Sequence, residues 1–239
     1  HTPFQAQKKY YDMYSHIKDP HKRIYYAMIK NLDDAVGRIN SKVSDLGLAE
    51  NTIIVFLSDN GGATYTTATD NAPLKGGKLT HFEGGLNVPF SMKWKGIIAE
   101  NSKYESPIVS TDIYSTMLKT LGIPLMEDRI YDGVDLLTHV TGKKKETAHE
   151  AICWRSDYLR SVRKGKWKLI EDRLGGETVL FNFKNNNYEK TNVYDENPQV
   201  VKDLIAVLDK WESQCDKPKW PRVMNFKFRD NNKEFYFPL

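Results

Sequence analysis

Residues 52–62, Thr-Ile-Ile-Val-Phe-Leu-Ser-Asp-Asn-Gly-Gly, decide the fold of this chain. The unbroken β-branched and aromatic run from Ile53 to Leu57 predicts a strand covered on both faces. A carboxylate, a carboxamide and two glycines follow it, and ligands bind at the carboxyl ends of strands in open α/β sheets. Asp59 and Asn60 carry the hard oxygen donors that calcium and magnesium prefer. All these residues also favour turns, so a plain turn is the alternative interpretation.

Helical and extended patterns alternate around this strand. Apolar residues recur at helical spacing through residues 22–46, and residues 88–94 have the composition of a second strand. Ser110 or Thr111 is predicted to cap a helix that runs through Leu121. This alternation indicates an α/β layer architecture.

A polar, lysine-rich linker from Thr141 to Glu150 separates a second unit. Short strand-like runs joined by turn residues predict an antiparallel meander, and an amphipathic helix follows from about Pro198 to Cys215. We expect residues 217–239 to form an irregular, extended tail held by aromatic side chains. The predicted strands are Ala151–Arg155, Leu159–Arg163, Trp167–Glu171 and Val179–Phe183.

The composition is that of an ordinary folded protein, with 40% hydrophobic and 28% charged residues among 239. The net charge of +4 is modest and the lysines are spread along the chain, which argues against a nucleic-acid surface. No apolar run approaches the length of a membrane span. Two cysteines, Cys153 and Cys215, have no metal-binding spacing.

Four blocks, in order along the chain, resemble the sulfatase family of the alkaline phosphatase superfamily, above all arylsulfatases A and B and bacterial glycan sulfatases. The resemblance covers residues 1 to about 215. It implies an α/β fold: part of an alkaline-phosphatase-like α/β sandwich in residues 1–142, then a small α+β subdomain with a four-stranded antiparallel sheet and one helix in residues 151–239. The blocks are His1-Thr2-Pro3-Phe4-Gln5, the strand and Ser-Asp-Asn-Gly-Gly of residues 52–62, the segment from Leu74-Lys75-Gly76-Gly77-Lys78 to Val88-Pro89-Phe90, and Trp154-Arg155 with Val162–Leu169.

The resemblance also implies parts that this chain does not contain. Sulfatases carry a nucleophile in a Cys- or Ser-x-Pro-x-Arg motif, whose first residue is oxidised to formylglycine, and a pair of metal-binding aspartates precedes it. Cys153 is followed by Trp-Arg-Ser and Cys215 by Asp-Lys-Pro, so neither fits the motif. We therefore expect the chain to be the C-terminal portion of a sulfatase, inactive alone, with the missing N-terminal half as its partner.

The same resemblance assigns roles to residues that are present. Asp59 and Asn60 match the family's calcium ligands, although two oxygens are only part of a calcium shell of six to eight. Lys78 matches the lysine that points its ammonium at the sulfate, where a fixed cation stabilises the transition-state charge. A solvated surface lysine is the alternative interpretation for Lys78. The nearby Lys75 fits that alternative better.

Histidines supply the remaining candidates. His1 corresponds to the histidine of the family's His-Thr-Pro segment, and an imidazole can give a proton to a leaving alkoxide or hold a sulfate oxygen. A cloning remnant is the alternative for a first residue. His81 either contacts substrate or packs against its loop, and Glu83 is expected to hold that loop by hydrogen bonds. The other histidines have no evident partners in the sequence and are given no role.

These observations favour a calcium-dependent sulfuric ester hydrolase that acts on a sulfated saccharide or an aryl sulfate, in a periplasmic, secreted or lysosomal location. Two alternatives remain. One is a phosphatase, phosphodiesterase or phosphonate hydrolase of the same superfamily, and these enzymes usually bind two zinc ions. The other is a non-catalytic fragment that binds sulfated glycans.

Overall fold

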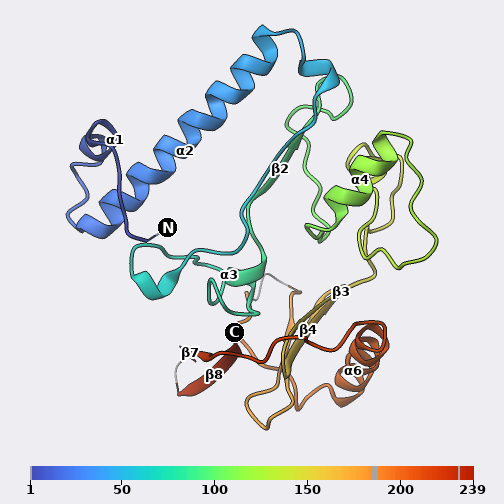
Figure 1. The fold of residues 1–239 in the computed structure, drawn as a ribbon. Helices are drawn as coiled ribbons and strands as arrows, with labels where there is room; N and C mark the ends of the chain where they lie inside the picture. Colours follow the sequence, from blue (N-terminus) through green and yellow to red (C-terminus); the bar gives the residue numbers. More distant parts are fainter. Residues whose placement is uncertain (1, 185–187, 231) are drawn as a thin grey trace. The chain divides into compact units, whose positions relative to one another are not determined.

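The computed structural model describes residues 2–184, 188–230 and 232–239. It contains two compact units, His1–Lys95 and Gly96–Leu239 (Figure 1). Residues 96–142, which the sequence analysis groups with the first domain, lie in the second unit. The predicted boundary between domains 1–142 and 151–239 stays a prediction.

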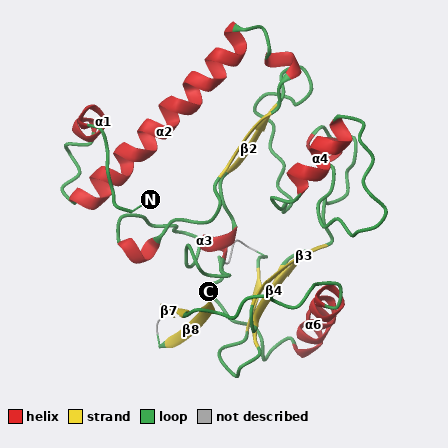
Figure 2. Cartoon of the chain, viewed as in Figure 1, coloured by secondary structure: helices red, strands yellow, loops and turns green. Residues whose placement is uncertain are grey.

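The first unit is built around a long helix and a two-stranded ribbon (Figures 1 and 2). Helix α2 begins after Asp19, whose carboxylate accepts hydrogen bonds from the backbone N–H groups of His21 and Lys22, and Pro20 occupies its first turn. It ends at Asp45 with Leu46 as the C-cap residue, and Gly47 follows with a φ of 69° that suits a residue without a Cβ. The predicted helix over 22–46 is confirmed. The elements are α1 (Lys8–Met13), α2 (Pro20–Asp45), η1 (Ala49–Asn51), β1 (Ile54–Leu57), η2 (Thr64–Thr66), α3 (Glu83–Leu86) and β2 (Phe90–Lys93).

Strand β1 is less covered than its composition predicts. Among the described residues it pairs only with β2, antiparallel, with Ile54 opposite Lys93 and Leu57 opposite Phe90. None of its side chains is buried, and Phe56 is 37% exposed. The prediction of a strand covered on both faces is therefore wrong for the described residues, because no side chain of β1 is buried on either face.

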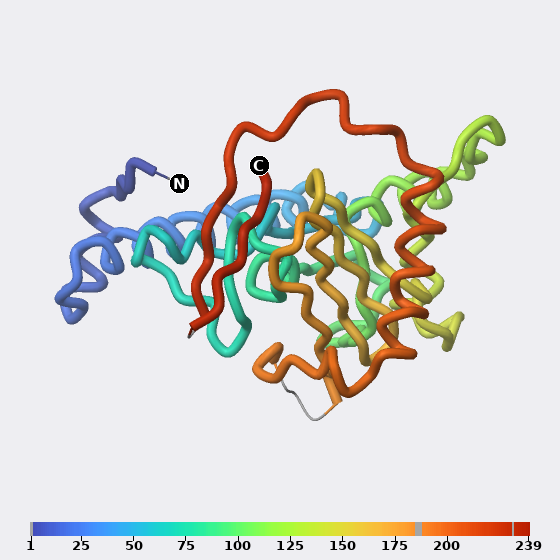
Figure 3. The backbone as a smooth tube through the Cα atoms, turned by 90° about the horizontal axis from the view of Figure 1, so that it is seen from below, coloured from blue at the N-terminus to red at the C-terminus, as the bar shows by residue number. Residues whose placement is uncertain are grey.

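The second unit contains the predicted meander. Its sheet has the order β3-β4-β5-β6, each strand antiparallel to the next, within the described residues. The strands are β3 (Ala151–Ser156), β4 (Leu159–Lys164), β5 (Trp167–Asp172) and β6 (Val179–Asn182). Helix α6 (Pro198–Glu212) runs along this sheet, as Figure 3 shows. Their shared core consists of Val162, Leu169 and Leu180 from the sheet and Val201, Leu204 and Leu208 from the helix.

Two further helices precede the sheet, α4 (Asp112–Thr120) and α5 (Leu137–Val140). Thr111 is the N-cap residue of α4, but its side chain makes no capping hydrogen bond. The fully buried Asp112 carboxylate instead accepts from the backbone N–H groups of Val109 and Val134, at 2.9 and 2.8 Å. It also contacts Nε2 of His149 at 2.8 Å. His149, which has no evident partner in the sequence, is thus part of a buried polar cluster.

The C-terminal segment forms a hairpin rather than an irregular tail. Strands β7 (Asn225–Asp230) and β8 (Lys233–Pro238) pair antiparallel. Aromatic residues at every second position, Phe226 and Phe228 in one strand and Phe235 and Phe237 in the other, carry this period-two signal. Trp220, one of the residues expected to hold the tail, is 81% exposed.

Candidate functional site

The end of strand β1 positions the first two candidate residues. The backbone N–H of Ser58 donates to the Pro89 carbonyl (3.1 Å), which continues the pairing with the β2 side of the ribbon. The Ser58 hydroxyl donates to the Asn60 carbonyl (2.7 Å), and the Asn60 N–H donates to Oδ1 of Asp59 (3.0 Å). This tight turn leaves the Asp59 side chain exposed and the Asn60 side chain half-buried. The turn and the ligand interpretations of Ser-Asp-Asn are therefore compatible.

Glycines allow three loops to come together behind this turn. The Gly61 N–H donates to the Gly85 carbonyl (3.0 Å), and a Cβ on Gly61 would lie 1.6 Å from the Gly84 carbonyl oxygen. A Cβ on Gly77 would lie 2.4 Å from the Gly62 carbonyl oxygen. No side chain fits at such distances, so the approach of the loops requires glycine.

Asn71 joins two of these loops and was not identified from the sequence. Its Nδ2 donates to the carbonyls of Gly62 (3.1 Å) and Gly76 (3.0 Å), and its Oδ1 accepts from the Gly62 N–H (3.1 Å). The Asn71 carboxamide thus hydrogen-bonds to the backbone on both sides and connects the Asp-Asn turn to the lysine-containing loop. The backbone N–H of Lys78 completes the connection by donating to the Gly62 carbonyl (3.0 Å).

We expect Asn71→Asp to lower the free energy of unfolding by about 2–4 kcal/mol, because two donor hydrogen bonds are lost and a carboxylate then faces two carbonyl oxygens. Asn87→Asp makes the same change at an exposed residue that lines the same cavity. That control is expected to shift stability by less than about 0.5 kcal/mol. Urea denaturation of both variants checks this, and equal stabilities would contradict the role of Asn71.

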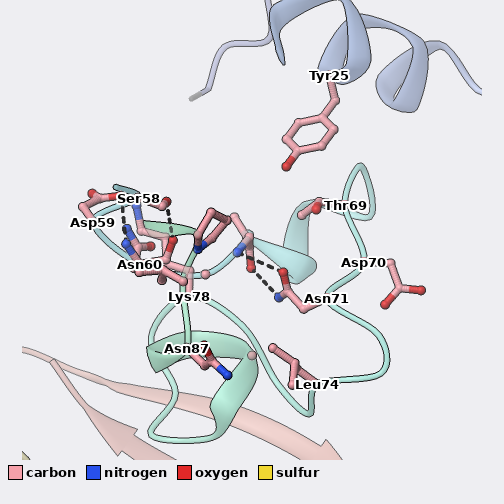
Figure 4. A pocket seen from close by; sticks show the side chains of 16 residues that line it. Tyr25, Ser58, Asp59, Asn60, Thr69, Asp70, Asn71, Leu74, Lys78 and Asn87 are labelled. Atoms are coloured by element: carbon pink, nitrogen blue, oxygen red, sulfur yellow. Dashed lines mark hydrogen bonds between the residues drawn. The ribbon is translucent and has the colours of Figure 1, made fainter. Parts of the chain in front are cut away.

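The loops surround a cavity of about 620 Å³ that brings Asp59, Asn60 and Lys78 together. Figure 4 shows these side chains grouped at one side of the cavity, with Asn71 and Asp70 at the other and the Tyr25 hydroxyl directed toward it from helix α2. The complete lining is Tyr25, Ser58, Asp59, Asn60, Gly61, Gly62, Ala63, Thr69, Asp70, Asn71, Leu74, Lys78, Gly84, Asn87, Val88 and Pro89.

Not every predicted site residue lies at this cavity. His81 is 7% exposed and Glu83 is 9% exposed, and neither lines the cavity. Lys75 does not line it either, and its ammonium lies 4.7 Å from the centroid of the Phe82 ring. His1 lies outside the described residues, so its predicted role stays a prediction.

The donor set fits part of a calcium site. The Asn60 Oδ1 atom is buried and has no hydrogen-bond partner within the described part of the chain. A buried carbonyl oxygen without a donor is costly unless something else binds it, and a cation would satisfy it. The adjacent Asp59 carboxylate adds negative charge and a second hard oxygen. The described residues contain no group of three or more His, Cys, Asp or Glu side chains arranged to hold a metal, so further ligands are required.

No helix within the described residues has the length and apolar character needed to cross a membrane. Cys153 and Cys215 are free thiols in the described chain, and burial raises the pKa of Cys153 to about 12. Neither cysteine lines the cavity of Asp59 and Lys78.

The chain is similar in sequence to known sulfatases. A sequence model of the family described as Sulfatase matches residues 1–123. The chain is 34% identical to human steryl-sulfatase (Homo sapiens) over 148 residues, which cover 59% of this chain and 25% of that protein. It is 28% identical to the N-acetylgalactosamine-6-O-sulfatase of Bacteroides thetaiotaomicron over 207 residues, or 76% of this chain and 40% of that protein.

Solved structures agree with the sequence comparisons. The crystal structure of Ps i-CgsB superposes with a TM-score of 0.82 at 27% identity, over 92% of this chain and 49% of that one. The same protein has been solved in complex with k-i-k-neocarrahexaose. The chain thus spans about half the length of this protein and less than half of the curated relatives it matches. The predicted α/β fold with a four-stranded antiparallel sheet is confirmed, and the chain belongs to the sulfatase family.

Proposed function

We propose that this chain is the C-terminal portion of a sulfuric ester hydrolase and that its cavity of about 620 Å³ holds the sulfate group. The observation that carries the proposal is the convergence of Asp59, Asn60 and Lys78 on one cavity, from loops separated by many residues. The membership of the sulfatase family supports the reaction class. A saccharide sulfate is the favoured substrate, because relatives include an N-acetylgalactosamine-6-O-sulfatase and a protein solved with a neocarrahexaose.

In this proposal Asp59 and Asn60 contribute two oxygens to a calcium site. Calcium, when bound, supplies positive charge that holds and polarises the sulfate oxygens. The upstream part of the protein would contribute the other ligands and the formylglycine that acts as the nucleophile. This division explains why we expect the chain alone to bind calcium poorly and to show no turnover.

Lys78 acts on the sulfate itself in this proposal. Cleavage of a sulfate ester builds negative charge on the departing oxygen and redistributes it over the sulfuryl oxygens. The backbone N–H of Lys78 is bonded to the Gly62 carbonyl, which fixes the main chain from which the ammonium extends, and that ammonium would offset the charge. His1 would donate a proton to the departing alkoxide, an assignment that rests on the sequence alone.

A calcium measurement on the full-length gene product tests the metal assignment. Asp59→Asn removes one negative charge from the turn, so we expect calcium affinity to fall at least about tenfold. Asp70→Asn makes the same change across the cavity and keeps the bond that the Asp70 side chain accepts from the Ala72 N–H. Calcium-dependent shifts in melting temperature report binding without any activity assay.

For that pair of variants, a loss of affinity confined to Asp59→Asn agrees with the assignment. Equal losses of calcium affinity in the two variants, or no loss in either, would contradict the assignment of Asp59 as a calcium ligand.

The coding region upstream of His1 distinguishes a sulfatase from a phosphoesterase. A Cys- or Ser-x-Pro-x-Arg motif preceded by two aspartates supports a sulfatase. A non-oxidisable nucleophile with additional Asp and His residues would support a phosphoesterase.

The proposed location follows from the same family. We propose a periplasmic, secreted or lysosomal protein, in which sulfated saccharides are accessible. Retention of the full-length protein in the cytosol would contradict this part of the proposal.

A further inference from the structure

An apolar stripe runs along helix α2 and continues to its C-cap residue. Its members follow one another at alternating intervals of four and three positions, which places them on one side of a helix. The stripe is about 30 Å long, because each helical residue advances by about 1.5 Å. The α2 stripe consists of Tyr25, Ile29, Leu32, Val36, Ile39, Val43 and Leu46.

Most side chains of the α2 stripe are accessible to solvent in this chain. Ile29 and Leu32 are 45% and 51% exposed, and Ile39 and Leu46 are 59% and 57% exposed. The other members are half-buried. A contiguous apolar surface of this length marks an interaction site.

Helix α1 covers a different side of α2. Nε of Arg23 donates to the Tyr11 carbonyl at 2.9 Å, and the Arg23 guanidinium lies 3.7 Å from the centroid of the Tyr11 ring. Ala27, one turn after Arg23, is fully buried. At about 100° per residue, Ala27 lies about 140° around the helix from Leu32, so the contact with α1 leaves the stripe uncovered.

The polar side chains of α2 pair with one another away from the stripe. The Lys30 ammonium lies 3.0 Å from a carboxylate oxygen of Asp33 and 2.7 Å from one of Asp34. An amphipathic helix gains most of its stability when its apolar face packs against a core. Within the described part of the chain, that packing is missing for the α2 stripe.

The position of the stripe indicates which partner covers it. Its first member, Tyr25, also lines the cavity of Asp59 and Asn60, and the Tyr25 hydroxyl is directed toward that cavity (Figure 4). The described residues supply only part of a calcium shell there. A partner that covers the stripe therefore extends to the place where further ligands are required.

The lengths of related proteins favour a partner from the same gene product. The chain aligns with 49% of Ps i-CgsB and with 40% of the N-acetylgalactosamine-6-O-sulfatase of Bacteroides thetaiotaomicron. Each of these proteins thus contains at least as much polypeptide again, which is ample to cover a surface of about 30 Å. A second copy of this chain would bring only the same incomplete set of donors to the cavity.

We propose that the α2 stripe is the surface on which the portion of the gene product upstream of His1 packs. The contact would hold that portion against the cavity of Asp59 and Asn60. The inference rests on the proposed function only in taking an upstream portion to exist. It gives a binding role to the members of the stripe after Tyr25, none of which lines the cavity.

Photo-crosslinking of the full-length gene product tests the contact without an activity assay. The protein is produced with photo-leucine, a diazirine analogue of nearly the same size as leucine, so packing is retained. We expect Leu32 and Leu46 to cross-link to peptides upstream of His1. Leu174 is the matched control, because it is 65% exposed between β5 and β6 and is expected to react with water.

A lysine introduced on the stripe gives a second measurement in the full-length gene product. Ile39→Lys would bury an ammonium without a partner, so we expect the melting temperature to fall by at least about 5 °C. Ser41→Lys adds the same side chain at an exposed residue on the opposite side of the helix. That control is expected to shift the melting temperature by less than about 2 °C.

Three cross-linking results would overturn the contact: links from Leu32 and Leu46 to a second copy, links to residues 96–239, or no link from either leucine. Equal melting temperatures of the Ile39→Lys and Ser41→Lys variants would also overturn it.

Failure of the proposed function has a different signature, because neither measurement uses sulfate, calcium or Lys78. A protein that forms the expected cross-links but releases no sulfate retains the contact and contradicts the proposed function. A protein that releases sulfate without these cross-links retains the proposed function and contradicts the contact.

Discussion

Lys78→Ala in the full-length gene product is expected to lower kcat/KM for a sulfate ester by about 10²–10³-fold. In the proposed mechanism the ammonium stabilises charge that develops on the sulfuryl group in the transition state, and loss of a donor at such a position costs about that factor. Lys78 is half-buried and is the lysine among the described residues that line the cavity of Asp59 and Asn60. Steady-state kinetics with an aryl sulfate measures the effect.

Lys75→Ala is the control for this substitution. Lys75 stands three residues earlier in the same loop, but its ammonium packs over the Phe82 ring and it does not line the cavity. We expect its kcat/KM to stay within about threefold of the unchanged protein, with a small loss of melting temperature. Comparable losses of kcat/KM in both variants would mean that Lys78 acts on the loop and not on the sulfate.

Gly61→Ala is expected to destabilise the protein by at least about 4 kcal/mol, or to prevent folding of the first unit. The new Cβ would lie 1.6 Å from the Gly84 carbonyl oxygen and 2.7 Å from the Gly84 carbonyl carbon. Both contacts are with backbone, so no side chain can rotate away. The Gly61–Gly85 hydrogen bond would break and the cavity that Gly61 and Gly84 both line would open.

Gly37→Ala is the matched change at a glycine without this constraint. Gly37 is exposed in helix α2, and an added Cβ would meet nothing within 4 Å. Alanine in a helix is favoured over glycine by roughly 0.5–1 kcal/mol, so this variant should be slightly more stable than the unchanged protein. The denaturation midpoints of Gly61→Ala and Gly37→Ala compare the two stabilities. A Gly61→Ala protein as stable as the unchanged protein would contradict the described packing of the loops.

The sequence predicts the elements that carry local signals. Helix α2 has an N-cap aspartate, a proline in its first turn and a glycine at its end, and the four strands of the meander are separated by turn residues. The positions of Asp59, Asn60 and Lys78 at one cavity follow from the resemblance to sulfatases and are compatible with the geometry. Such signals are local or belong to a known pattern, so they can be read without a structure.

Other features depend on contacts that no local pattern encodes. Asn71 binds the backbone of Gly62, nine residues away, through its side chain, and a single asparagine between two loops carries no periodicity. The exposure of Phe56 depends on what packs on its face of the strand, which the strand's own composition does not reveal. The burial of His81 depends on how its loop folds back. The β7–β8 hairpin differs, since the alternating aromatic residues give a signal that points to strands.

Release of inorganic sulfate by the full-length gene product tests the central claim most directly. Ion chromatography would follow sulfate from a sulfated oligosaccharide, beside phosphate from a matched phosphate monoester, with and without calcium. The account predicts calcium-dependent sulfate release with a kcat/KM at least about 100-fold above that for the phosphate ester. Preferential hydrolysis of the phosphate ester would contradict the account. An equal rate of sulfate release with and without calcium would also contradict it.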